Sequence, residues 1–158
     1  MIVMLLFLVS IFVVFLGLFC GLAIGLLAEE ELVLGKKYLI FFRTVLFFVS
    51  LIIFACSILI KGLFVPALVV VVLTLLFYMN KERFTIYYYL LAIMLCFAWI
   101  YNFFIILGPI AFLYGFPQGS LYILEQKNRK LFKQIIGLLA KHSGFVIIVI
   151  FAVVLGLF

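Results

Sequence analysis

The sequence predicts an all-α fold: a polytopic helical membrane bundle with five to six transmembrane segments and one basic amphipathic helix at the membrane surface. Of the 158 residues, 72% are hydrophobic and 10% are charged, whereas a soluble domain is typically about half apolar and about a quarter charged. The apolar residues run together in blocks, and a helix of about 20 apolar residues crosses a bilayer. We therefore interpret residues 1–158 as a single integral membrane domain, multi-pass in the cell membrane.

The first apolar block, residues 2–27, is predicted to be a retained transmembrane helix. No Lys or Arg precedes it, and it is much longer than the apolar core of a cleavable signal peptide. Gly17, Gly21 and Gly25 recur at every fourth position, so they lie on one face of the helix and let another helix backbone come close. This helix-packing face serves either a neighbouring helix of the same chain or a second subunit, and the sequence leaves both open.

A polar loop, residues 29–37, is predicted to lead into the second crossing at residues 38–60. The loop begins with Glu29, Glu30 and Glu31, which in a homo-oligomer would form an acidic ring at a pore mouth. We favour a solvated loop, because successive residues of a helix do not converge on one point. Acidic side chains also suit the N-terminus of the helix that follows.

Two further crossings are predicted at residues 63–79 and 84–101, each after a tight turn. Together with the second crossing they are expected to form a compact three-helix meander. Tyr87, Tyr88 and Tyr89, near the start of the later segment, are interpreted as part of an aromatic belt at a membrane interface.

Residues 103–119 are apolar, but Gly108-Pro109 interrupts them. The segment is predicted to be a kinked crossing or a re-entrant hairpin, since irregular backbone survives in a membrane only where it is packed in protein or lines a wet cavity. Asn102 with Gly108 and Pro109 is one candidate for a pathway or binding site, because broken helices often build transporter sites. A simple loop between crossings explains the same residues equally well.

Ser120 is predicted to cap a basic amphipathic helix over residues 121–134, which lies along the membrane surface. The last crossing is predicted at residues 135–158. Lys141 and His142 either respond to pH or hold a headgroup, or they form an interfacial pair, which is the interpretation we favour. The residues expected to contact anionic lipid headgroups are Lys127, Arg129, Lys130, Lys133, Lys141 and His142.

The orientation depends on whether residues 103–119 cross the membrane. If they do, Lys61 is alone on one side and the other ten of the 11 Lys and Arg residues share the opposite side. The positive-inside tendency therefore favours six crossings with both termini outside.

A polar stripe runs along the second predicted crossing, where Lys36, Arg43, Ser50 and Ser57 recur at every seventh position. One interpretation is a track that faces the bundle interior and suits an anion or a lipid headgroup. The other, which we favour, is that Lys36 and Arg43 extend to the membrane surface while the serines bond back to their own helix. Arg43, Ser50 and Ser57 nevertheless form the best candidate for a pathway or binding surface.

Most of the side chains that enzymes use are missing from this sequence. It contains a single histidine and no aspartate. Its five acidic residues are glutamates, and all five lie at predicted loops or helix ends. Neither converging carboxylates for Mg²⁺ nor a zinc motif of the H-E-x-x-H type is present in the sequence, so no catalytic residue, metal or cofactor is predicted. The net charge of +6 lies in short segments between apolar blocks, which indicates anionic headgroups rather than nucleic acid as partners.

These observations favour a non-enzymatic membrane protein that acts as a homo-oligomer, or as a subunit or assembly partner of a larger membrane complex. The alternative is a small channel or transporter for an ion or small solute. A lipid-modifying membrane enzyme is the weaker alternative. The expected partners are the lipid bilayer, anionic headgroups, and further copies of the chain or other membrane subunits.

Overall fold

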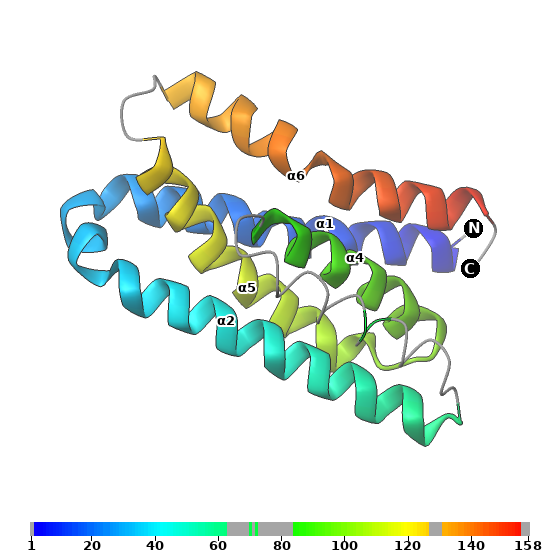
Figure 1. Cartoon of the computed structure of the whole chain (residues 1–158). Helices are drawn as coiled ribbons and strands as arrows, with labels where there is room; N and C mark the ends of the chain where they lie inside the picture. The colour runs from blue at the N-terminus through cyan, green and yellow to red at the C-terminus, as the bar shows by residue number, and fades with distance from the viewer. Residues whose placement is uncertain (1, 63–69, 71, 73–83, 127–130, 156–158) are drawn as a thin grey trace.

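The computed structural model describes residues 2–62, 70, 72, 84–126 and 131–155, and these residues form helices and turns without a strand. Four of the described helices are long and apolar enough to cross a membrane, so the chain fits a helical membrane bundle, as the sequence predicts. The helices are α1 (Ile2–Leu27), α2 (Glu29–Ile60), α4 (Phe84–Ile100), α5 (Phe104–Glu125) and α6 (Leu131–Val154) (Figure 1).

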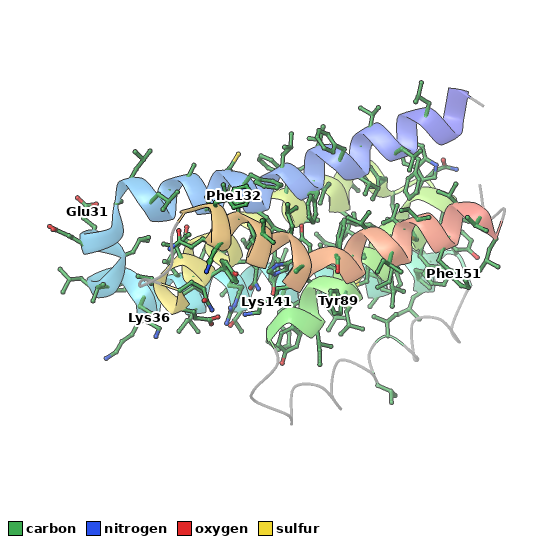
Figure 2. The ribbon with its side chains drawn as sticks, turned by 90° about the horizontal axis from the view of Figure 1, so that it is seen from above. Glu31, Lys36, Tyr89, Phe132, Lys141 and Phe151 are labelled. Atoms are coloured by element: carbon green, nitrogen blue, oxygen red, sulfur yellow. The ribbon has the colours of Figure 1, made fainter. Side chains whose placement is uncertain are left out.

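The central helix of the bundle is α5, which packs along α1 and α2 and touches α4 and α6. α1 and α5 run in the same direction, whereas α2 and α6 run against them (Figure 1). The α1–α2 turn and the end of α5 lie at one end of the bundle, which we call the charged end. Glu31 and Lys36 lie at the charged end, and Phe151 lies toward the other (Figure 2). α1 begins and α6 ends at that other end.

The bundle is apolar on its outside as well as its inside. Phe12, Phe41 and Phe151 each expose more than 60% of their surface, and a helix that is apolar all round is typical of a membrane span. Inside, aromatic rings join the helices: the Phe7 ring of α1 lies 5.1 Å from the Trp99 ring of α4. These outer faces therefore suit lipid chains rather than water.

The predicted polar loop at residues 29–37 is wrong, because α2 is helical from Glu29 onward. Only Ala28 separates α1 from α2. Glu30 and Glu31 lie in the first turn, where the helix dipole stabilises negative charge. Glu, Leu and Lys are also good helix formers, and a single glycine, Gly35, costs a helix only about 1 kcal/mol.

The region predicted as a kinked crossing or a re-entrant hairpin is one continuous helix, α5, which includes both Pro109 and Pro117. Each proline removes one backbone hydrogen bond. Neighbouring helices can compensate within a bundle, and α1 packs closely along α5 at this level. The hairpin is therefore not formed.

The predicted amphipathic helix over residues 121–134 is not a separate element of the described chain. Leu121–Glu125 is the last part of α5, and the next described helix, α6, begins at Leu131. Ser120 does not cap a helix but lies inside α5, where its hydroxyl donates to the carbonyl of Gly21 at 2.8 Å. The last predicted crossing accordingly begins four residues earlier than expected.

The third predicted crossing, residues 63–79, lies outside the described residues except for Val70 and Val72. The fourth, residues 84–101, corresponds to α4. The interpretation of Tyr88 as part of an interfacial belt is wrong, because its side chain is fully buried in the bundle.

The length of α2 leads to a topology prediction. Its 32 residues span about 48 Å at 1.5 Å per residue, which exceeds a hydrocarbon core of about 30 Å. In a variant lacking Cys20, Cys56 and Cys96, we expect a membrane-impermeant thiol reagent to label Glu31→Cys and Lys61→Cys from opposite faces of sealed vesicles. Labelling of both from the same face would show that α2 does not cross.

Candidate functional site

Three polar side chains from three helices meet inside the bundle, and we call them the buried polar cluster: Arg43 of α2, Gln118 of α5 and His142 of α6. Arg43 and Gln118 each expose only 4% of their surface, and His142 exposes none. Arg43 Nη1 donates to Gln118 Oε1 at 3.2 Å, and Gln118 Nε2 lies 3.1 Å from His142 Nε2. One hydrogen-bonded chain therefore connects α2 to α6 through Gln118 of α5. On α6, His142 Nδ1 also lies 3.0 Å from the carbonyl of Leu138.

The chemistry of these groups fixes the direction of each bond. A guanidinium only donates, so the amide oxygen of Gln118 faces Arg43 and its NH₂ group faces His142. The amide nitrogen also only donates, so His142 Nε2 accepts. The proton of His142 therefore resides on Nδ1 and is donated to the Leu138 carbonyl, which makes the imidazole neutral in this arrangement.

Helix continuity brings the three side chains to one level. Because α2 starts at Glu29, Arg43 lies about 21 Å inside that helix instead of next to a loop. Because α5 continues through Pro117, Gln118 can point into the bundle rather than into a turn. A buried charge is expensive unless it is hydrogen-bonded, so the amide of Gln118 stabilises Arg43 in the interior.

Two tyrosines form an aromatic wall beside the cluster. The ring of Tyr88 from α4 meets the His142 ring edge-on, with centroids 5.3 Å apart, and it stacks on the Tyr114 ring of α5 at 6.1 Å. The Tyr88 hydroxyl is fully buried and has no hydrogen-bond partner among the described residues. Buried hydroxyls nearly always have a partner, so this wall offers a polar atom to an additional small group.

Lys141 lies next to His142 in the sequence but outside the cluster. Its Nζ is 3.0 Å from Glu125 Oε2 and lies over the Tyr122 ring at 5.4 Å. The Tyr89 hydroxyl donates to the Lys141 carbonyl at 2.7 Å, and Figure 2 shows these two residues beside each other. Lys141 is thus an exposed residue, whereas the interpretation of His142 as its interfacial partner is wrong because His142 is buried.

The polar stripe on α2 contributes only one residue to the cluster. Ser50 is buried, but its hydroxyl donates to the Leu46 carbonyl of its own helix at 2.8 Å, which is the interpretation the sequence favoured. Ser57 is partly buried and Lys36 is exposed. Arg43 is the exception, because it points inward instead of extending to the membrane surface.

Asn102, Gly108 and Pro109 lie away from the cluster. Asn102 is exposed in the α4–α5 turn, with a φ of 62°. Gly108 and Pro109 line an apolar groove of about 440 Å³ between α5 and α1. Pro109 is about 14 Å from Gln118 along the helix axis, so the structure does not bring the two candidate sites together.

The glycine face of α1 packs against α5 of the same chain. A Cβ atom at Gly17 would collide with the backbone carbonyl of Phe112, and one at Gly21 with the carbonyl of Phe116. At Gly25 it would lie 3.1 Å from the Ile123 side chain. Between the two possibilities that the sequence left open, the structure therefore places this contact within the chain.

The basic residues are divided between described and other parts of the chain. Lys127, Arg129 and Lys130 lie outside the described residues. Lys133 is exposed near the start of α6, and Lys141 is exposed eight residues further along the same helix. Their expected contact with anionic headgroups stays a prediction. In the part of the chain that the structure describes, no group of His, Cys, Asp and Glu is placed to hold a metal ion.

Sequence reasoning missed Gln118, Tyr88 and Tyr114 as neighbours of Arg43 and His142. One signal was available for Gln118, because it is the only amide within a long apolar segment and lies between Pro117 and Gly119. The tyrosines carried no such signal, since their burial depends on how α4 and α5 meet. Comparison with protein-family models, curated proteins and solved structures found no match to this chain, so its function is inferred from its own residues.

Proposed function

We propose that this chain is a non-enzymatic membrane protein that binds a small oxyanion at the buried polar cluster and carries or conducts it across the bilayer. This is the channel or transporter alternative, made specific for an anion. The observation that supports it is the hydrogen-bonded chain from Arg43 through Gln118 to His142, which lies inside helices apolar enough to span a membrane.

Arg43 gives the site its chemical preference. A guanidinium is always charged and presents donors in a planar fork that matches carboxylate and phosphate oxygens. Ionisable residues within membrane-spanning segments face the bundle interior and mark substrate pathways. Arg43 has this location, with 4% of its surface exposed, so a carboxylate or phosphate is the ligand class that fits best.

Charge at the entrance supports the same ligand. Lys36 and Lys37 are exposed on α2 on the charged-end side of the cluster, whereas Lys141 is paired with Glu125. The chain as a whole has a net charge of +6. Clusters of one sign raise the local concentration of the opposite ion and its association rate. The exposed Glu30 and Glu31 lie in the first turn of α2, at the charged end of the bundle.

The assembly hypothesis loses its main support. It relied on Gly17, Gly21 and Gly25 as a contact with a second copy or another subunit, and α5 occupies that face. Assembly through a different surface stays a prediction.

The test measures binding of acetate and inorganic phosphate by isothermal titration calorimetry to protein in phosphatidylcholine nanodiscs. We expect Arg43→Gln to weaken binding at least tenfold, because one charge-assisted hydrogen bond contributes about 1.5–3 kcal/mol. Lys61→Gln is the matched control, since it removes one positive charge from an exposed position at the C-terminal end of α2, away from the cluster. No binding by the wild type, or equal binding by Arg43→Gln, would contradict the proposal.

A second arm identifies the source of the anion. The same titration is repeated in nanodiscs that contain phosphatidylglycerol. If the anionic lipid abolishes binding of phosphate, the natural ligand is a lipid headgroup. If phosphate still binds with the same affinity, the ligand is a free solute.

A further inference from the structure

We propose that the buried polar cluster is a proton-coupled switch, in which a proton bound at His142 Nε2 turns the Gln118 amide away from Arg43 and prepares the site for an anion. This rests on the proposed function and deepens it, because it names the proton as a second ligand of the same site. The geometry that carries it is the single Gln118 amide held between the Arg43 guanidinium, which donates, and His142 Nε2, which accepts, on two different helices.

The resting arrangement has one polarity only. Gln118 gives its oxygen to Arg43 and its NH₂ group to His142, at 3.2 and 3.1 Å. An amide has one oxygen and one nitrogen on opposite sides of its carbon. If the oxygen accepts from a cation on one side, the NH₂ group faces the other side and needs an acceptor there. Neutral His142 is that acceptor.

Proton binding reverses the requirement. A hydronium ion of the aqueous phase transfers its proton to the lone pair of His142 Nε2, so an N–H bond forms while an O–H bond breaks and water is left. The ring then becomes a donor at both nitrogens. The NH₂ group of Gln118 then faces another donor, so the amide rotates and presents its oxygen to the imidazolium. Its NH₂ group now faces Arg43, and the hydrogen bond between Arg43 and Gln118 is lost.

The charge balance calls for an anion in this second state. The cluster carries one positive charge before protonation and two afterwards, inside a bundle where isolated charge is expensive. A monoanion such as a carboxylate, bound by the donors of Arg43 and of the Gln118 NH₂ group, returns the net charge to its earlier value. The buried Tyr88 hydroxyl, which lacks a partner among the described residues, belongs to the ring that packs on His142. Proton and anion therefore bind together.

Each neighbouring helix contributes a group that acts on His142. Tyr88 comes from α4, Tyr122 and Glu125 from α5, and Arg43 acts from α2 through Gln118. Lys141 adjoins His142 on α6 and is paired with Glu125 at 3.0 Å, so these two neighbouring charges have opposite signs. On α1, between Phe7 and Gly25, Cys20 is the titratable side chain and it is exposed. Arg43 is the positive charge of the cluster itself, and it faces His142 across the Gln118 amide.

The first experiment observes the switch directly, because His142 is the only histidine of the chain. Protein with ¹⁵N-labelled histidine and glutamine in phosphatidylcholine nanodiscs is studied by NMR over a pH series. We expect a neutral ring with its proton on Nδ1 at high pH and a doubly protonated ring at low pH. The Gln118 side-chain amide, assigned from a Gln118→Asn sample, should shift at the same pH. A neutral ring with its proton on Nε2 would overturn the proposal.

The second experiment measures acetate affinity over the same pH series. We expect the wild type to bind about tenfold more tightly once His142 is protonated, a typical size for coupling between two ligands. His142→Gln should bind with an affinity independent of pH, while Ser143→Ala, an exposed neighbour, should keep the wild-type dependence. Circular dichroism and elution volume verify that each variant is folded.

The outcomes separate the two proposals. If acetate and phosphate bind at no pH, the anion-binding function fails, and the NMR titration alone decides whether the switch exists. If acetate binds equally tightly at every pH while His142 titrates, the anion site stands and the coupling is overturned.

Discussion

Replacing Gly21 with leucine is expected to destabilise the bundle by at least about 3 kcal/mol without changing the oligomeric mass. A Cβ at this position collides with the carbonyl of Phe116 and lies 2.8 Å from the carbonyl of Gly115. Both atoms belong to the backbone of α5, so a side-chain rotation cannot relieve the contact. Overpacking usually costs about 1–3 kcal/mol. Because leucine at this position forces two helix backbones apart, we expect a cost at or above the upper end of that range. The loss of the hydrogen bond from Ser120 to the Gly21 carbonyl adds to it.

The measurement is SDS-induced unfolding in mixed micelles. The fluorescence of Trp99, the only tryptophan, reports on α1 because its ring contacts Phe7. Gly35→Leu is the matched control: a Cβ there meets no described heavy atom within 4 Å, and leucine favours a helix more than glycine does. A Gly21→Leu variant as stable as the wild type, or one that loses oligomeric mass while its monomer stays folded, would show that α5 is not the partner of this face.

Replacing Gln118 with leucine is expected to destabilise the fold by about 2–4 kcal/mol. The change removes the acceptor of Arg43 Nη1 and the donor to His142 Nε2, and each buried polar group that loses its partner costs about 1–3 kcal/mol. Ser50→Ala is the control, because that hydroxyl bonds only within α2, to Leu46. We expect the control to change stability by less than about 1 kcal/mol.

A double-mutant cycle with Arg43→Met distinguishes the network from simple packing. Arg43→Met should also destabilise the protein when made alone, because Gln118 keeps a buried oxygen without this donor. The double variant Arg43→Met with Gln118→Leu should be more stable than the sum of the single effects predicts, by about 1–3 kcal/mol. Strictly additive effects would mean that Arg43 and Gln118 do not depend on each other.

The fold class follows from the sequence because it depends on composition and on the lengths of local segments: long apolar blocks with few charges between them. The glycine face was equally visible, since Gly17, Gly21 and Gly25 repeat at helical spacing. Its partner was missed because Gly115 and Gly119 each lie two residues from Pro117, and both residue types are typical of breaks in a helix. Within a bundle the same glycines serve close packing instead, and local pattern does not separate these two uses.

The polar cluster was predictable only in part. The spacing of Arg43 on α2 marked it as a candidate, but the same spacing fitted a side chain that extends to the membrane surface. The Arg43 side chain points inward because it bonds to Gln118. The position of Gln118 along the bundle axis is set by the packing of α5 on α1. His142 was assigned to the interface because its neighbour Lys141 is there, although adjacent helical residues point about 100° apart. Such register between distant helices is not encoded within any one segment.

The close contact between α1 and α5 has a consequence for biosynthesis. The glycine face of α1 finds its partner only when α5 is complete, because Gly25 and Glu125 are about 100 residues apart, and synthesis proceeds at about 5–20 residues per second. For roughly 5–20 s the first inserted helix therefore presents this glycine face to the membrane without its α5 partner. During that interval, two nascent chains on neighbouring ribosomes can pair through α1 before either is finished. Slow translation should thus increase misassembled dimers, whereas the mature protein, with α5 in place, no longer offers that face.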